Sequence, residues 1–395
     1  MKVAIICFDF KESNLRKQPW RYIYEIAKGL KSYGHDVFII TDNYNLSNNK
    51  KTINGIKIIG VDRLFILFRG ESKDVLSILS RENPDVIIML VGLTSFLRVH
   101  FKINKPVIGI FTSPIYSLKE LIKNVGIKDL IAYYRYTAIH LINSLIPRFL
   151  VKKWSQKFKY IIVLSQRNRE RLIKKGVPES KIIVIPPGID EEFLKFPEQE
   201  IIKRIRSEIS SDKVPIVMYY TSPLTLRGTD TLIKALPYIL KKREVKVLIL
   251  SRPDYKSVLK EEEKLKRLAN KLNVEKNIII ISKYLPPEDI KAYIASADIV
   301  VLPFKLVISD VPLSILEPMA LGKIVISTDL DGIPEILKEK GLIVKPNSPE
   351  DLARKILLVL EDNVLRYKLE RNAQEFIKNW PKWRNVVERI KELIV

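Results

Sequence analysis

Short apolar runs rich in β-branched residues alternate with helix-like segments along nearly the whole 395-residue chain. In the first half the runs occupy 2–8, 36–41, 56–61, 85–91, 106–111 and 160–164. In the second half they recur at 214–220, 245–251, 277–281, 298–302, 324–328 and 342–344. Strands that are separated by helices pair in parallel, and the helices cover both faces of the sheet. The alternation therefore predicts an α/β fold with doubly wound parallel sheets.

The length of the chain exceeds one typical core, so we expect two domains. The segment PPGIDEEFLKFPEQE (186–200) is rich in proline and poor in apolar residues. We place the linker at 191–200, which leaves a first domain at 1–190 and a second at 201–381.

The single cysteine, Cys7, excludes an internal disulfide and suits a reducing compartment. Met1 leads directly into a strand-like run, without the pattern of a signal peptide. The longest apolar run, 86–97, is about half the length that crosses a bilayer. We therefore expect a cytoplasmic protein that is soluble or peripheral on the cytoplasmic membrane face.

The net charge of +23 is unevenly distributed. Residues 98–185 hold 18 Lys and Arg against 4 Asp and Glu. Such a surface favours an anionic partner, and we rank a membrane surface first, general solubility second and nucleic acid last. Within it, 115–153 is predicted to form one or two amphipathic helices broken near Gly126 and Pro147. These would either lie in a headgroup layer or pack as a pair on the first domain.

The stretch SDVPLSILEPMALGKIVISTDLDGIPEIL (309–337) suggests a ligand site. A loop that carries Ser309, Asp310 and Ser314 leads into an apolar, helix-like run that contains Glu317. A loop that enters a helix presents free backbone N–H groups, which suit a diphosphate, and a carboxylate there can hold sugar hydroxyls.

Several segments, in the same order, resemble the retaining GT-B glycosyltransferases of glycosyltransferase family 4. They are IAKGLKSYGHDVFIIT, YIIVLSQRNRERLIKKGVPESKIIVIPPGID, LRGTDTLIKALPYI, and ADIVVLPF followed by the 309–337 stretch. The resemblance implies two Rossmann-like domains that face each other across a cleft. The first would hold the acceptor and the second a nucleotide sugar, and a last helix at 382–395 would cross back onto the first domain.

The resemblance also assigns roles in the donor site. Glu317 matches the second glutamate of the family's pair, which binds the donor ribose. Arg227 matches a basic residue that neutralises the diphosphate as it leaves. The family's other basic residue falls on Thr221 or Ser222, and Arg252, after another strand, is expected to compensate. Backbone N–H groups of Val311 and Leu313 remain available for the phosphates.

The chain departs from the family pattern at three further places. The first glutamate of the pair is replaced by Ser309, and Asp310 lies one residue out of register. The usual glycines after the first strand give way to a loop with Lys11 and Arg16. Thr112 and Ser113 stand where a histidine is common. We place Lys11, Arg16, Thr112 and Ser113 on the acceptor side, and we expect Arg227, Glu317 and Asp310 to form the catalytic set.

These features predict a retaining hexosyltransferase that needs no metal or cofactor beyond its nucleoside diphosphate sugar and that uses a glycan or lipid-linked acceptor. A binding or scaffold protein that has lost catalysis is the alternative, and another enzyme on the same fold is the third class. The Asp-Leu-Asp triplet at 329–331 is interpreted as a loop rather than a metal site.

Overall fold

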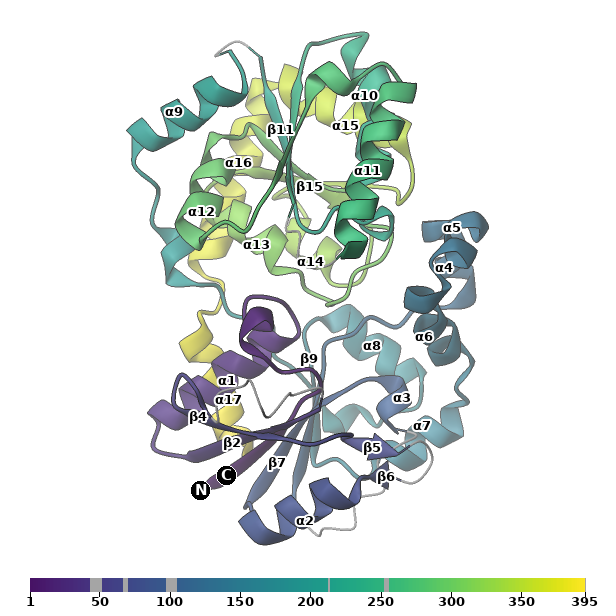
Figure 1. Ribbon diagram of the computed structural model, residues 1–395, viewed down its shortest axis with the longest axis vertical. Helices are drawn as coiled ribbons and strands as arrows, with labels where there is room; N and C mark the ends of the chain where they lie inside the picture. The colour runs from purple at the N-terminus through teal and green to yellow at the C-terminus, as the bar shows by residue number, and fades with distance from the viewer. Residues whose placement is uncertain (43–51, 67–69, 97–104, 212–213, 252–255, 395) are drawn as a thin grey trace.

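The computed structural model describes the chain except residues 43–51, 67–69, 97–104, 212–213, 252–255 and 395. Two α/β units lie one above the other along the long axis of the molecule (Figure 1). Each unit has a central, mainly parallel sheet, so the predicted fold class is confirmed.

The first sheet has eight strands in the order β10-β9-β8-β7-β1-β2-β4-β3. All pairings are parallel except the one between β3 and β4. A separate two-stranded ribbon joins β5 (Phe65–Ile66) to β6 (Gly70–Glu71). The strands of the main sheet are β1 (Lys2–Ile6), β2 (Asp36–Thr41), β3 (Thr52–Ile53), β4 (Ile56–Gly60), β7 (Val86–Val91), β8 (Val107–Phe111), β9 (Tyr160–Val163) and β10 (Ile182–Val184). The helices of this unit are α1 (Trp20–Ser32), α2 (Lys73–Glu82), α3 (Leu93–Phe96), α4 (Leu118–Val125), α5 (Ile127–Ala132), α6 (Tyr134–Leu145), α7 (Arg148–Ser155) and α8 (Gln166–Lys174).

The second sheet has six parallel strands in the order β13-β12-β11-β14-β15-β16. They are β11 (Ile216–Tyr220), β12 (Lys246–Ser251), β13 (Ile278–Ser282), β14 (Ile299–Leu302), β15 (Ile324–Thr328) and β16 (Leu342–Val344). The helices are α9 (Gln199–Ile209), α10 (Thr229–Leu240), α11 (Lys256–Lys271), α12 (Pro287–Ser296), α13 (Leu313–Ala320), α14 (Ile333–Leu337), α15 (Pro349–Glu361) and α16 (Asn363–Lys378). The chain runs outward from β11 to β13 and returns to β14 on the other side of β11. Ligands of such sheets bind at this reversal, at the carboxyl ends of the strands.

The last helix, α17 (Trp383–Ile394), packs against α1 of the first unit. Gly29 permits this approach, because a Cβ there would lie 2.5 Å from a methyl carbon of Val387. The Trp383 ring meets Tyr22 edge-on at 5.8 Å, and the Trp380 indole donates to the Pro187 carbonyl at 2.8 Å. Both tryptophans thus pack at the junction of the units. Among the described residues no helix is long and apolar enough to cross a membrane.

Candidate donor site

A cleft of about 870 Å³ lies between the two units. One wall comes from the ends of β11, β12 and β13 and from the loop and first turns of α13. The other comes from the loop before α1, from Tyr136 of α6 and from the turn at Glu191–Leu194. The cleft therefore lies at the chain reversal of the second sheet, where a ligand is expected.

Glu317 lies on the second-unit wall of the cleft, in the second turn of α13. The Tyr220 hydroxyl lies 2.8 Å from Glu317 Oε2 and 2.8 Å from the Ser314 carbonyl oxygen. Pro318 explains the second contact. It has no N–H to donate to the carbonyl four residues earlier, so that carbonyl needs another donor. The single O–H proton of Tyr220 is thus shared between the carbonyl that Pro318 leaves without a helical donor and the carboxylate that faces the cleft.

Arg227 lies on the same wall, in the turn Thr225–Arg227, and donates to Thr221 Oγ1 at 2.5 Å. Gly228 ends the turn in the left-handed region, with φ of 79°. A Cβ at that position would lie 1.7 Å from the Pro303 carbonyl oxygen. Only glycine fits both constraints, so this residue sets where Arg227 points.

The structure brings most of the predicted donor residues to this cleft. Ser222, Ser309 and Leu313 line it with Thr221, Arg227 and Glu317. Ser309 is 4% exposed, and its hydroxyl makes no hydrogen bond within the described structure. Ser309 thus lines the cleft, but its hydroxyl oxygen is itself buried. Arg252 lies outside the described residues.

Asp310 does not face the cleft, contrary to the sequence prediction. Its side chain is fully buried, and its Oδ1 accepts from the Gly332 N–H at 3.0 Å. Its own N–H donates to the Thr112 carbonyl at 2.9 Å across the domain boundary. Val311 is also buried, at 1% exposure, and lies outside the cleft lining. Asp310 thus contacts the first unit, whereas Ser309, Pro312 and Leu313 of the same loop line the cleft.

The four residues predicted on the acceptor side do not all lie in the cleft. Arg16 lines the first-unit wall of the cleft. Lys11 lies outside that lining and pairs with Asp9 at 2.9 Å. Thr112 is buried at the domain boundary, and the Ser113 carbonyl accepts from Asn168 Nδ2 at 3.2 Å. These last two are structural in this arrangement.

The sequence interpretation missed other charged residues of the cleft, among them Arg21 and Lys283. Lys283 directly follows β13, so its position after a strand's carboxyl end was the available clue. Arg21 is engaged by Asp190 at 2.6 Å and by Glu25 at 2.8 Å. Within the described ranges no three His, Cys, Asp or Glu side chains are grouped to hold a metal.

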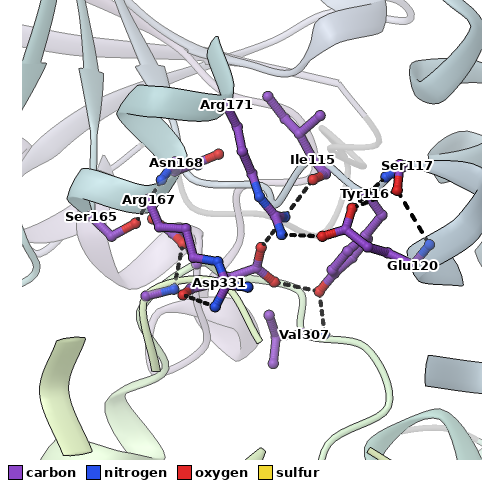
Figure 2. Close-up of polar contacts among 12 residues, drawn as sticks. Ile115, Tyr116, Ser117, Glu120, Ser165, Arg167, Asn168, Arg171, Val307 and Asp331 are labelled. Atoms are coloured by element: carbon purple, nitrogen blue, oxygen red, sulfur yellow. Dashed lines mark hydrogen bonds and ion pairs between the residues drawn. The ribbon is translucent and has the colours of Figure 1, made fainter. Parts of the chain in front are cut away.

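A polar cluster beside the cleft joins the two units (Figure 2). Asp331 accepts from the Tyr116 hydroxyl at 2.5 Å and from Arg171 at 2.7 Å. Burial raises the pKa of Tyr116 well above its ordinary value, and so does the Asp331 charge. The phenol therefore stays protonated and donates. The triplet at 329–331 thus belongs to a loop, as predicted, but its last aspartate is a buried interdomain contact that the sequence did not reveal.

The boundary between the two units also provides a hydrogen-bond acceptor for the free N–H groups at the start of α8. The N–H groups of Gln166 and Arg167 donate to the Glu335 carboxylate at 3.1 and 2.7 Å. A carboxylate from the second unit thus caps a helix of the first. Arg167 also pairs with Asp329 at 2.7 Å, on the exposed rim of the cluster.

The comparisons with known proteins agree with this geometry. The family description "Glycosyltransferase Family 4" matches residues 20–193, and "Glycosyl transferases group 1" matches residues 201–376. An uncharacterized glycosyltransferase of Methanocaldococcus jannaschii is 25% identical over 378 residues, which cover 92% of this chain and 90% of the relative. N,N'-diacetylbacillosaminyl-diphospho-undecaprenol alpha-1,3-N-acetylgalactosaminyltransferase of Campylobacter jejuni is 28% identical over 238 residues, covering 58% of this chain and 59% of the relative.

Among solved structures, Anabaena HepE in complex with UDP and glucose superposes with a TM-score of 0.72 at 16% identity, covering 99% of this chain and 98% of that one. At this identity the likeness concerns the fold. Two Rossmann-like units with a cleft between them make up the GT-B architecture. The chain belongs to the group 1 glycosyltransferases of family 4.

Proposed function

We propose that this glycosyltransferase moves a hexose from a nucleoside diphosphate sugar to a glycan or lipid-linked acceptor, with retention of configuration and without a metal ion. The observation that carries the donor assignment is the placement of Glu317 and Arg227 on one wall of the cleft. A carboxylate there can accept from two ribose hydroxyls, and a guanidinium can bind a diphosphate through two parallel hydrogen bonds.

The cleft supports a transfer that relies on positioning and charge. As the sugar–oxygen bond of the donor breaks, negative charge develops on the diphosphate, and Arg227 stabilises it. A phosphate oxygen of the leaving group takes the acceptor proton on the same face of the sugar, which gives retention. The Arg227 guanidinium then supplies charge neutralisation that a divalent cation supplies elsewhere. We therefore expect activity to survive a chelator.

The acceptor is proposed from the relatives. The Campylobacter jejuni relative is named for an undecaprenol diphosphate acceptor, which is lipid-linked. The first-unit wall carries Arg16 and Lys17, which suit an anionic acceptor group. We place the enzyme peripherally on the cytoplasmic membrane face on this basis.

A nucleotide-sugar-binding protein without catalysis is the second candidate. It is favoured by the substitution of Ser309 for the first glutamate and by the withdrawal of Asp310 from the cleft. A panel of radiolabelled nucleotide sugars separates the two. Donor hydrolysis or transfer that Arg227→Ala lowers at least about a hundredfold supports the enzyme. Saturable binding without turnover, with and without membrane extract as an acceptor source, supports the binding protein.

A further inference from the structure

Helices α4 to α7 carry an unusual share of the exposed apolar side chains. Of the 22 large hydrophobic residues that are exposed in the described parts of the chain, ten lie between 118 and 149. They are Leu118, Ile122, Ile127, Ile131, Tyr134, Tyr136, Ile139, Ile142, Leu145 and Phe149. We call the surface of residues 118–155 the helical platform. It stands out at one side of the molecule, beside the junction of the two units (Figure 1).

The apolar positions of the platform follow helical spacing. On α6, Tyr134, Ile142 and Leu145 share one face, since residues three, four or seven to eight apart lie on the same side of a helix. Their exposed fractions are 61%, 50% and 76%. Phe149, at the start of α7, is 70% exposed. An apolar face of this kind, left open in the described structure, is typical of a docking surface.

The charge of the platform identifies the partner. Its seven basic residues are all exposed, namely Lys119, Lys123, Lys128, Arg135, Arg148, Lys152 and Lys153. Its two acids are both engaged: Glu120 pairs with Arg171 at 2.6 Å, and Asp129 pairs with Lys305 at 3.0 Å. The outward charge is therefore positive. A second copy bound to this surface across a two-fold axis would place the same basic residues opposite one another, where their charges repel.

We propose that the helical platform docks on a phospholipid bilayer that contains anionic lipids. Exposed isoleucine, leucine and aromatic side chains would enter the headgroup layer, and the lysines and arginines would pair with lipid phosphates. Neither contribution suffices alone for stable binding of a peripheral protein, and the platform carries both on the same helices.

The platform also leads into the cleft. Tyr136 is 55% exposed on α6 and lines the cleft as well. The Tyr133 hydroxyl lies 2.9 Å from the Glu261 carboxylate of α11, and Lys305 is fully buried between Asp129 and Asp230, at 3.0 Å from each. A docked platform would therefore hold the cleft beside the bilayer. This deepens the proposed function by giving a route for a lipid-borne acceptor, and that part rests on the proposed function.

Flotation with phosphatidylcholine vesicles, with and without phosphatidylglycerol, tests the proposal without donor or acceptor. The protein should float with the anionic vesicles at low salt and remain below with phosphatidylcholine alone. Combined Ile131→Ser, Tyr134→Ser, Leu145→Ser and Phe149→Ser should lower the floated fraction at least about tenfold. A second variant that combines Lys128→Glu, Lys152→Glu and Lys153→Glu should lower the floated fraction by a similar factor. It should also remove the dependence of flotation on salt concentration.

The matched control is Val364→Ser with Tyr367→Ser on α16, at residues that are 81% and 67% exposed and far from the platform in sequence. This variant should float like the unaltered protein. UDP and GDP binding by calorimetry should be the same in all variants, which separates failure of docking from failure of the proposed function. Absence of flotation at low salt, equal flotation of the four-site apolar variant, or a solution dimer that this variant dissociates would overturn the proposal.

Discussion

The Tyr116 hydroxyl and the Asp331 carboxylate meet at 2.5 Å across the boundary between the two units. The hydroxyl also accepts from the Val307 N–H at 3.2 Å, so one phenol joins two separate loops of the second unit to the first. The Asp331 side chain is fully buried, whereas the side chain of its partner Arg171 is 15% exposed. The contact between the two units therefore includes a buried carboxylate with two donors from the opposite unit.

Asp331→Ala should destabilise the protein by about 3 kcal/mol, because it leaves Tyr116 and Arg171 buried without their shared acceptor. Asp329→Ala is the control, since it removes an ion pair whose acid is 59% exposed. It should cost no more than about 1 kcal/mol. Urea unfolding measures both. Equal losses would show that the buried contact has no special weight.

The stability of the folded protein should fall as pH rises. Burial raises the pKa of Asp310 to about 8, and the charges of Asp331 and Glu335 add to this, whereas Gly332 and Ser165 oppose it. Burial also raises the pKa of Asp331 to about 6, against the lowering effect of Arg171. Near neutral pH the proton of the pair thus resides on Asp310.

The sign follows from proton uptake. Between pH of about 4 and 8 the folded protein holds a proton on Asp310 that the unfolded chain has lost. The stabilisation from this proton is therefore complete below pH of about 4, and it is lost progressively as the pH rises to about 8. Asp310 contributes a slope of about 1.4 kcal/mol per pH unit across this window, and Asp331 adds to that slope below pH of about 6. Asp310→Asn keeps an acceptor for Gly332 and should flatten the dependence. Thermal unfolding at several pH values checks this, and an unchanged slope in the variant would refute it.

Tyr220→Phe should weaken nucleotide binding about tenfold, which corresponds to about 1.4 kcal/mol, because Glu317 loses the donor that orients it. The variant also strands the Ser314 carbonyl. Adding Pro318→Ala restores a helical N–H for that carbonyl. The double variant should regain stability without regaining affinity. If affinity returns with stability, Tyr220 acts only through the helix.

Gly228→Ala should destabilise the second unit by about 2 kcal/mol or more and should lower nucleotide affinity, because it displaces the turn that carries Arg227. Gly34→Ala provides the comparison. Gly34 also has a positive φ, of 82°, but its Cβ would meet nothing within 4 Å. That variant should show only the smaller backbone cost and unchanged binding. Thermal unfolding measures the stability of the two variants, and calorimetry measures their nucleotide affinity. Equal effects of the two substitutions would contradict the prediction.

All six strands of the second sheet could be predicted from sequence, and so could those of the first sheet except β3 and β10. The run 324–328 is β15 as observed, and 85–91 differs from β7 by one residue. Strands of a parallel sheet are buried on both faces, so they appear as continuous apolar runs that need no tertiary information. The donor-site roles of Glu317 and Arg227 were implied by the family resemblance, and both residues line the cleft.

Side-chain direction in the loops could not be predicted. Asp310 and Ser309 are neighbouring polar residues, yet Asp310 contacts the first unit and Ser309 lines the cleft. The difference depends on the pairing of Asp310 with Thr112, which is 198 residues away in the sequence as counted from their numbers. The interdomain contact of Asp331 could not be predicted for the same reason, because its partners Tyr116 and Arg171 lie in the other unit.

Binding of UDP, GDP and ADP by isothermal titration calorimetry tests the central claim most directly, with the unaltered protein beside Glu317→Ala. At least one of these nucleotides should bind to the unaltered protein, and the variant should lose at least about tenfold in affinity, since a charge-assisted contact to ribose is removed. Failure of all three to bind, or equal affinity in the variant, would contradict the assignment of this cleft to the donor.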